Sequence, residues 1–391
     1  MRDVFIVGVG MTEFGELWEK ALRELITEAG LEAVQDAGVR GPDIDAMYVA
    51  SASAGRLLGQ QQLGVLALDE AGLAGHHVPA TRIEAGDASG AAALRSAALA
   101  VASGAHDVVV AGGVEKMTDV LEDDATRALA SSADMEWEGF FGATLPALYA
   151  MMARSHAAEH GTTRDQLAHV AVKNHEHGAD NPDAAFPFTT SLESVKGSPP
   201  VSDPIRMFDC ASPVDGAAAL VLADRDTAEQ LGGPRVQITA TAQASDALAL
   251  HRRDAITELA SSQAAAEEAF AETDHGPEDV DLAELHDVYT IAELISLESL
   301  GFYEPGMAAT ATVKGRTTHG GDLVVNPSGG LKARGHALGA TGLAQAAEVA
   351  AQIRRDAGER QVEDAQVGLT QAVAGTGGTS IVHVLEGGGE L

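Results

Sequence analysis

Short apolar runs alternate with helix-periodic segments along this chain, and the alternation occurs twice. The first half has apolar runs at 3–10, 43–53, 80–90 and 106–117, and helical spacing at 17–37 and 90–103. A similar order resumes at 236–245, with a helical segment at 256–272, a strand-like run at 282–289, a glycine-rich turn at 327–342 that leads into a helix to 355, and two final apolar runs. Apolar runs joined by helices predict a mainly parallel sheet with helices on both faces. The repeated order predicts a duplicated α/β fold.

Residues 118–205 interrupt this order. They hold clusters of Met, Trp and Phe, two helix-like stretches at 144–160 and 164–178, and loops that contain proline. Loops beside a sheet often carry the residues that contact a substrate. We therefore predict a first half formed by 1–117 and 206–232, an inserted loop domain at 118–205, and a second half at 233–391.

The net charge is −33, from 58 acidic against 25 basic side chains, and the acidic residues are spread over the whole chain. Such a surface repels phosphate backbones and anionic lipids, so we expect neither nucleic acid nor a membrane as a partner. High salt screens the self-repulsion of a dispersed acidic surface. This composition predicts a halophilic protein, with an ordinary acidic protein as the alternative.

The sequence contains one cysteine, Cys210, so no disulfide can form within the chain. The first residues place acidic side chains close to a short apolar run, which is unlike a signal peptide. No stretch approaches the ~20 apolar residues that span a bilayer. These features predict a cytoplasmic protein.

The most informative stretch is NPSGGLKARGHALGATG at 326–342, which surrounds His336 with glycines. Glycine permits positive φ and a close approach of the backbone, so these residues can shape a tight pocket around one imidazole. An imidazole accepts or donates a proton near neutral pH. His336 is therefore a candidate catalytic residue.

Several segments resemble those of thiolases. GGLKARGHALGATG resembles the family's glycine-rich loop with its histidine, and ELHDVYTIAELISLESLGFYEPG resembles the HDxF segment of sterol-carrier-type and archaeal members. FDCASPVDGAAALVLAD, AGGVEKMTD and MMARSHAAEHGTTRDQLAHVAVKNH resemble further thiolase segments. The resemblance runs from the first strand to the last. It implies two βαβαβαββ-type halves in a five-layered αβαβα arrangement, with a loop domain inserted in the first half.

The resemblance also implies an activity. Thiolases transfer an acyl group from CoA to a cysteine, and the enolate of a second acyl-CoA then attacks that thioester; the reverse reaction cleaves a 3-ketoacyl-CoA. The resemblance implies a CoA thioester as the substrate, with a short-chain 3-ketoacyl-CoA such as acetoacetyl-CoA as our expectation, and no tightly bound cofactor. The alternative is a catalytically silent homologue that binds acyl-CoA or acts as a structural subunit.

The resemblance implies partners as well. Thiolases form homodimers or homotetramers, so we expect one of these assemblies here. The archaeal members imply two further partners, a small protein with an OB fold and a zinc ribbon, and hydroxymethylglutaryl-CoA synthase.

The resemblance assigns roles residue by residue. The histidine that activates the nucleophile corresponds to His336, and the histidine of the oxyanion hole corresponds to His286. The nucleophilic cysteine corresponds to Asp87 in IEAGDASG. The second cysteine of the family is absent, since the HDxF segment has Val288 at that position and the loop at 369–380 contains no cysteine. Cys210 lies in another segment, where a small core residue is expected.

Asp87 allows three interpretations. It can cap the following helix, where a carboxylate accepts first-turn amides and suits the helix dipole. It can act as the nucleophile and form a mixed anhydride with the acyl group. It can also orient a histidine that acts as a base on Ser89, which would make Ser89 the nucleophile of a Ser–His–His site. This last interpretation requires a non-helical turn at 87–90, because two positions along a helix differ in direction by roughly 200°.

The remaining candidates concern binding. The expected contacts of the CoA thioester are three glycines, Gly330, Gly339 and Gly377, and three candidates for its phosphates, Arg334, Lys332 and Arg95. His175 and His177 have a spacing that occurs in metal sites, but no cysteine or acidic cluster accompanies them. We therefore expect no metal.

Overall fold

The computed structural model describes residues 1–388, and most of their strands join one large sheet. Its strands are β1 (Val4–Met11), β2 (Ala46–Ala50), β3 (Ala80–Ile83), β4 (Val108–Glu115), β7 (Gly216–Asp224), β8 (Val236–Ser245), β9 (Leu282–Glu284), β10 (Val324–Val325), β11 (Val367–Ala374) and β12 (Thr379–Gly387). Their order across the sheet is β10-β9-β11-β12-β8-β1-β7-β4-β2-β3. Buried apolar runs thus form most of the strands, as the sequence predicts, whereas the edge strand β3 is only partly buried.

The two halves of the sheet repeat one arrangement. The order is β3-β2-β4-β7-β1 in the first half and β10-β9-β11-β12-β8 in the second. In each half the first three of these strands are parallel and the last two pair antiparallel. Two residue pairs between β1 and β8, Phe5 with Gln237 and Ile6 with Val236, join the halves. The predicted duplication is confirmed. The predicted mainly parallel sheet is wrong, because within residues 1–388 four neighbouring strand pairs are parallel and five are antiparallel, the latter made by the first and last strands of each half.

Helices cover both faces of each half. The principal ones are α1 (Leu22–Ala37), α3 (Leu63–Glu70), α4 (Ser89–Ala102), α10 (Ala260–Ala271), α11 (Thr290–Ser299) and α14 (Leu338–Arg354). Shorter ones are α2 (Ala54–Leu57), α9 (Arg225–Leu231), α12 (Ala308–Val313) and α13 (Gly330–Arg334). Within residues 1–388, none of the helices combines the length and apolar character that crossing a membrane requires.

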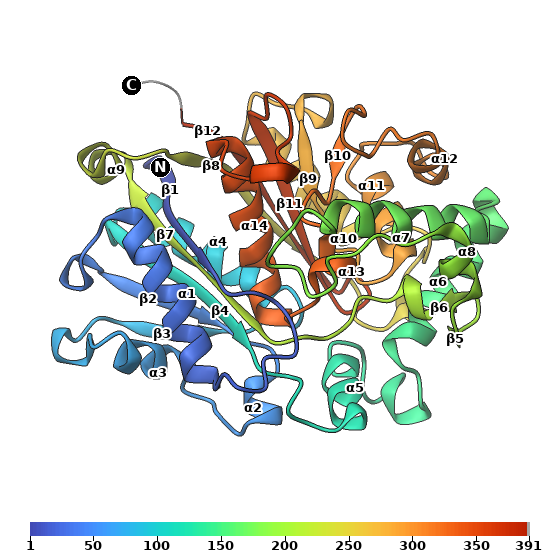
Figure 1. The fold of residues 1–391 in the computed structure, drawn as a ribbon, viewed down its shortest axis with the longest axis horizontal. Helices are drawn as coiled ribbons and strands as arrows, with labels where there is room; N and C mark the ends of the chain where they lie inside the picture. The colour runs from blue at the N-terminus through green and yellow to red at the C-terminus, as the bar shows by residue number, and fades with distance from the viewer. Residues whose placement is uncertain (389–391) are drawn as a thin grey trace.

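The helices and half-sheets form five layers. The alanine-rich helices α4 and α14 contact each other and pack on strands of both halves, so they form the middle layer (Figure 1). Leu94, Leu220 and Leu343 belong to the apolar core of this layer. α1 covers the outer face of the first half and α10 that of the second. The predicted αβαβα arrangement is confirmed.

The segment between β4 and β7 forms the inserted region. It contains α5 (Glu122–Ala130), α6 (Leu145–His160), α7 (Arg164–Gly178), α8 (Leu192–Gly197) and the antiparallel pair β5 (Pro200–Ser202) and β6 (Ile205–Arg206). Thr163 caps α7 by accepting a hydrogen bond from the Gln166 amide. α7 contacts α11, α12 and α13, so this region packs on helices of the second half (Figure 1).

The two central helices begin side by side. A β-carbon added at Gly90 would lie 2.6 Å from the carbonyl oxygen of Gly339, and one added at Gly113 would lie 2.2 Å from the same oxygen. Glycine at these positions lets the start of α14 sit directly on α4 and β4. The loops that precede α4 and α14 therefore meet at one place.

Candidate active site

Asp87 lies in the turn that joins β3 to α4. Gly86 has a φ of 57°, which turns the chain sharply before Asp87. One carboxylate oxygen of Asp87 accepts a hydrogen bond from the Ser132 hydroxyl at 3.0 Å, and the other accepts one from the Gly375 amide at 3.0 Å. α4 has no side-chain cap hydrogen bond, so Asp87 does not cap its own helix as one interpretation of the sequence supposed. Its carboxylate binds other segments of the chain instead.

Ser89 is the first residue of α4, and its side chain closes the same turn. Its hydroxyl donates a hydrogen bond to the Gly86 carbonyl at 2.5 Å and accepts one from the Ala85 amide at 2.9 Å. The side chain is fully buried. Both hydrogen bonds of the Ser89 hydroxyl are therefore made inside the turn. The non-helical turn over 87–90 that a Ser89 nucleophile requires is not formed, because α4 begins at Ser89.

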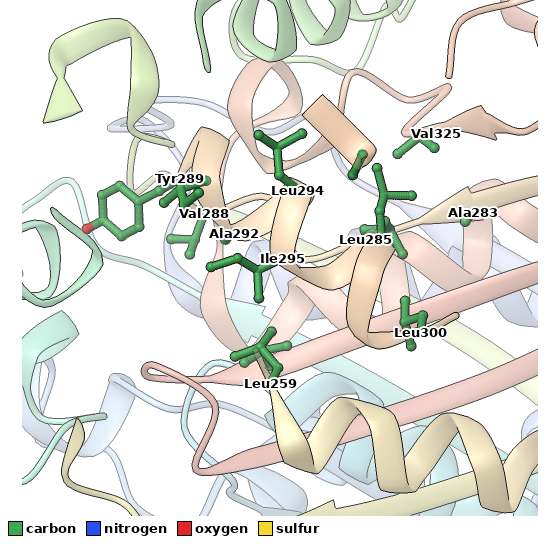
Figure 2. Packing of buried hydrophobic residues seen from close by; sticks show 14 of the residues in the cluster. Leu259, Ala283, Leu285, Val288, Tyr289, Ala292, Leu294, Ile295, Leu300 and Val325 are labelled. Carbon is green, nitrogen blue, oxygen red and sulfur yellow. The ribbon is translucent and has the colours of Figure 1, made fainter. Parts of the chain in front are cut away.

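His286 follows β9 at the point where the chain leaves the sheet. The sequence pattern predicts a strand over 282–289, but the strand ends at Glu284. Side-chain oxygens replace the missing strand partners, because Asn326 accepts a hydrogen bond from the Leu285 amide at 2.7 Å and Gln371 accepts one from the His286 amide at 3.3 Å. Leu285, Val288 and Tyr289 anchor this segment in the apolar cluster around α11 (Figure 2).

Asp287 links this segment to the glycine-rich loop. Its carboxylate accepts hydrogen bonds from the amides of Leu331 at 2.7 Å and Lys332 at 3.2 Å. Gly330 has a φ of 60°, and a β-carbon there would lie 2.4 Å from a carboxylate oxygen of Asp287. Glycine at this position thus allows the carboxylate to hold α13 against the segment that carries His286.

His336 lies between α13 and α14. Gly335 has a φ of 102°, and the His336 amide donates a hydrogen bond to the Ser212 carbonyl at 2.9 Å. On the ring, Nδ1 lies 2.9 Å from the Thr341 hydroxyl on the first turn of α14. This contact orients the imidazole and leaves Nε2 for another partner.

The fold brings the carboxylate and the two imidazoles together. The rings of His286 and His336 are nearly perpendicular, with centroids 5.2 Å apart. One side-chain atom of Asp87 and one ring nitrogen of each histidine lie within 4.8 Å of one another. All three side chains are buried. Neither ring nitrogen of His286 has a hydrogen-bond partner within residues 1–388, and nor does Nε2 of His336.

Burial controls the charges in this group. It lowers the pKa of His286 to about 3 and, together with His286 and Arg334, holds the pKa of His336 well below its usual value. Burial also raises the pKa of Asp87 to about 6, against the hydrogen bonds from Gly375 and Ser132, which lower it. Both imidazoles are therefore neutral at neutral pH, which leaves a lone pair on each ring.

The three glycines expected to contact CoA are buried. Gly339 is enclosed by Ser51 and by Glu115, whose carboxylate accepts a hydrogen bond from the Gly339 amide at 3.1 Å. Gly377 has a φ of 115°, and its carbonyl accepts a hydrogen bond from the Ser261 hydroxyl at 2.7 Å. Gly330 and Gly339 thus make close contacts with carboxylates, and Gly377 turns the chain before β12.

Two of the basic residues expected to bind CoA phosphates are enclosed. Arg334 is fully buried and lies 3.4 Å from the carboxylate of Glu284. The Lys332 ammonium donates a hydrogen bond to the Cys210 carbonyl at 2.8 Å. The Cys210 thiol lies 3.4 Å from the Arg206 carbonyl, and burial raises its pKa to about 12, so it fits the packing role predicted for it.

The sequence motifs missed Ser132, Thr341 and Glu115. Glu115 ends β4 and accepts hydrogen bonds from the amides of Ala52 and Ser53 as well as from Gly339. It therefore ties the loop after β2 to the start of α14. An acidic residue at the end of the apolar run VVVAGGVE was the available signal, because a buried carboxylate requires several donors.

Comparison with known proteins agrees with this architecture. The thiolase N-terminal domain matches residues 4–192, and a thiolase C-terminal domain-like region matches residues 242–387. The chain belongs to the thiolase family. It is thus a thiolase-like enzyme, and thiolases use CoA thioesters as substrates without a tightly bound cofactor.

Relatives of this thiolase have different descriptions. It is 52% identical to the acetyl-CoA acetyltransferase of Methanothermobacter thermautotrophicus, covering 98% of this chain and 99% of the relative. It is 32% identical to human sterol carrier protein 2, covering 99% of this chain and 72% of that protein. A solved structure described as "Ltp2-ChsH2(DUF35) aldolase" has a TM-score of 0.87 and 27% identity, covering 100% of this chain and 99% of the other.

Proposed function

We propose that this enzyme transfers acyl groups between CoA thioesters by forming or cleaving a short-chain 3-ketoacyl-CoA such as acetoacetyl-CoA. The observation that carries the proposal is the meeting of His286 and His336, each with an unpartnered ring nitrogen, at a carboxylate from the other half of the chain. The similarity to acetyl-CoA acetyltransferases supports the substrate class.

The chemistry divides between the three side chains. Cleavage of a 3-ketoacyl-CoA breaks the bond between C2 and C3 and leaves the enolate of the shorter acyl-CoA. We assign the stabilisation of the enolate oxygen to an N–H of His286, and proton transfer to His336. A donor aimed at a developing oxyanion in a buried site is worth about 3 kcal/mol in the activation barrier.

Asp87 is our preferred candidate for the group that meets the acyl carbon, with Ser89 as the alternative. The Asp87 carboxylate faces both imidazoles, whereas the Ser89 hydroxyl must break two hydrogen bonds inside its turn before it can attack. Attack by Asp87 on acetyl-CoA would form a mixed anhydride and release CoA as its thiolate, which then takes a proton. In the cleavage direction the same attack at C3 of the 3-ketoacyl-CoA releases the enolate, and free CoA then takes the acyl group from the anhydride. Mass spectrometry after incubation with acetyl-CoA would show an acetyl group on Asp87, on Ser89 or on neither.

Aldol cleavage of a 3-hydroxyacyl-CoA is a second candidate function. The specific observation in its favour is that an aspartate occupies the position of the family's thiol, and a structural relative is described as an aldolase. Aldol cleavage removes the proton of the 3-hydroxyl group, breaks the C2–C3 bond and gives a carbonyl compound and an enolate. No acyl group is transferred, so the reaction requires no nucleophile on the enzyme.

One set of assays separates these functions. Purified enzyme would receive either acetoacetyl-CoA with free CoA, or a 3-hydroxyacyl-CoA alone. We expect turnover of the first substrate, and we expect His336→Ala to lower that turnover by about 10²–10⁴-fold because proton transfer is lost. The matched control is His76→Ala, since His76 is exposed.

The outcomes are distinct. If the enzyme converted the 3-hydroxyacyl-CoA and not acetoacetyl-CoA, aldol cleavage would replace acyl transfer as the proposed function. Binding of acyl-CoA without turnover of either substrate would instead identify a catalytically silent binding or structural subunit. Equal activity of His336→Ala and His76→Ala would remove His336 from the reaction.

We also propose that the enzyme works in an assembly. A homodimer or homotetramer, a small partner with an OB fold and a zinc ribbon, and hydroxymethylglutaryl-CoA synthase are the partners we infer. The structural relative whose description joins Ltp2 to a DUF35 component supports a protein partner of this kind. Light scattering of the pure chain, and co-purification of a tagged chain from its own cells, would test the assembly in high salt and in the cytoplasm.

A further inference from the structure

The position that carries a thiol in thiolases carries a carboxylate here, and this change completes a set of three ligands. We propose that Asp87, His286 and His336 bind one divalent transition-metal cation of the Zn²⁺ or Co²⁺ type. The proposal rests on the proposed function, because it places the cation where the thioester carbonyl would enter. The sequence led us to expect no metal, because neither a cysteine nor an acidic cluster accompanies His175 and His177. The three residues proposed here lie far apart along the chain and show no ligand spacing.

The geometry of the donor atoms supports the site. One atom from each of the three side chains lies within 4.8 Å of the other two. Two imidazole nitrogens and a carboxylate oxygen, with further positions open to water or substrate, form a ligand set that zinc and related cations accept. Ligand bonds of about 2.1 Å in tetrahedral geometry place the donor atoms about 3.4 Å from each other, so the side chains need to approach by up to about 1.4 Å.

The hydrogen-bonding pattern leaves the required lone pairs free. Nε2 of His336 and both ring nitrogens of His286 are buried without a partner within residues 1–388. A buried polar atom without a partner lowers stability, and native structures contain few of them. A cation would satisfy one nitrogen on each ring.

Contacts behind the ligands hold them in place. Thr341 binds Nδ1 of His336, and Ser132 and Gly375 bind the Asp87 carboxylate. At His286 the backbone is held, because its amide donates a hydrogen bond to Gln371, while its ring nitrogens have no partner within residues 1–388. Metal-binding histidines and carboxylates in proteins are oriented by such partners. Gln371 is fixed in turn by the hydroxyls of Ser262 and Ser296.

The charges around Asp87 also favour a cation. The neighbouring charges that act on it are the carboxylates of Glu115 and Glu84. The positive charge of Arg334 acts on His336, but the carboxylate of Glu284 lies 3.4 Å from that guanidinium and offsets its charge. A divalent cation would offset the negative charge at the turn that carries Asp87.

A cation at this site would supply a Lewis acid in place of a thiol. It would polarise a thioester carbonyl and stabilise the oxygen of an enolate, which acyl transfer and aldol cleavage both require. In the metal-free protein the imidazole N–H groups are left to do this alone. The cation would engage Nε2 of His336 and the Asp87 carboxylate, so we expect acylation of Asp87 to be suppressed while the site is occupied.

Cobalt binding tests the proposal without substrate. The full chain would be treated with a chelator, dialysed and titrated with Co²⁺ in high salt, with the visible absorption of cobalt and calorimetry as readouts. We expect one cobalt per chain and a visible absorption stronger than that of the hydrated ion, because the site has fewer ligands than six waters. Asp87→Asn should weaken binding at least tenfold, since it removes the charged ligand.

Glu84→Gln is the matched control. It removes the same charge from the same turn, but the exposed Glu84 side chain binds the Gly86 amide instead of facing the histidines. His286→Ala is a second variant, to be used if Asp87→Asn fails to fold. We expect it to bind cobalt at least tenfold more weakly than the unaltered chain. The absence of saturable binding, or equal affinity of Asp87→Asn and Glu84→Gln, would overturn the proposal.

Separate activity assays distinguish this proposal from the proposed function. A chain that binds cobalt through these residues but converts no CoA thioester would keep the cation site and reject acyl transfer. A chain that is active after chelation and binds no cobalt would keep acyl transfer and reject the site.

Discussion

The two halves build the same connection, from their third strand to their central helix, with different loops. In the first half, residues 84–88 join β3 to α4 and carry Asp87. In the second, residues 326–337 join β10 to α14, include α13 and carry His336. The first loop is a tight turn closed by Ser89, whereas the second is a longer loop fixed by Asp287.

The loops after the second strand of each half differ in the same way. After β9 the chain places His286 in the site. After β2 the corresponding loop carries no histidine, and the buried carboxylate of Glu115 accepts its amides at Ala52 and Ser53. The comparison teaches that duplication supplies a scaffold that brings equivalent loops together, while the chemistry depends on which residues the loops carry.

The largest expected effect comes from separating α14 from β4. Gly113→Ala would place a β-carbon 2.2 Å from the carbonyl oxygen of Gly339, which is backbone and cannot rotate away. We expect the free energy of unfolding to fall by about 3 kcal/mol, together with a loss of activity as the two loops move apart. Unfolding in urea, in high salt, would measure the change in stability.

Gly112→Ala is the control for this change. Gly112 is the preceding residue of β4, and a β-carbon there would meet nothing within 4 Å. We expect its stability to remain within about 0.5 kcal/mol of the unaltered protein. If the two variants proved equally stable, the contact between α14 and β4 would not hold the halves together.

A smaller loss of stability is expected in acid, and it should destabilise the loop at 326–337 before the loop at 84–88. His177 lies on α7, and its Nδ1 lies 3.0 Å from the carbonyl oxygen of Asn326, where the second loop begins. Burial, followed by the charges of Lys173 and His319, lowers the pKa of His177 to about 3. As the pH falls, the imidazole of His177 is protonated in the unfolded chain before it is protonated in the folded chain. Its contribution to the free energy of unfolding is therefore fully present above about pH 6.5 and is lost as the pH falls toward 3.

The measurement is the free energy of unfolding between pH 7 and pH 5. We expect a loss of about 1–2 kcal/mol from His177 at pH 5, and a shallower pH dependence in His177→Gln, which has no titrating ring. Hydrogen exchange should rise at 326–337 before it rises at 84–88. Identical pH profiles for the two proteins, or earlier exchange at 84–88, would contradict this assignment.

The sequence predicts the scaffold better than the site. The strand at 236–245 and the helix at 164–178 have the predicted bounds, because their apolar spacing and caps are local signals. The end of β9 was missed because its last partners are side chains, Asn326 and Gln371, that lie far along the chain. The resemblance placed Asp87, His286 and His336 on thiolase positions, but no pattern in the sequence relates Asp87 to Ser132 or Gly375.

The smallest expected effect concerns the acidic surface that both halves share. The net charge is −33, so the acidic side chains should repel one another in dilute salt. Raising KCl from low concentration to the molar range should increase stability by about 1 kcal/mol, or roughly 2 °C in the unfolding temperature of a chain of this size. Because β1 pairs with β8 and the central helices touch both halves, we expect one cooperative transition at every salt concentration. Two transitions that separate as salt is lowered would show that the halves are independent units, and a stability that falls with salt would remove the halophilic interpretation.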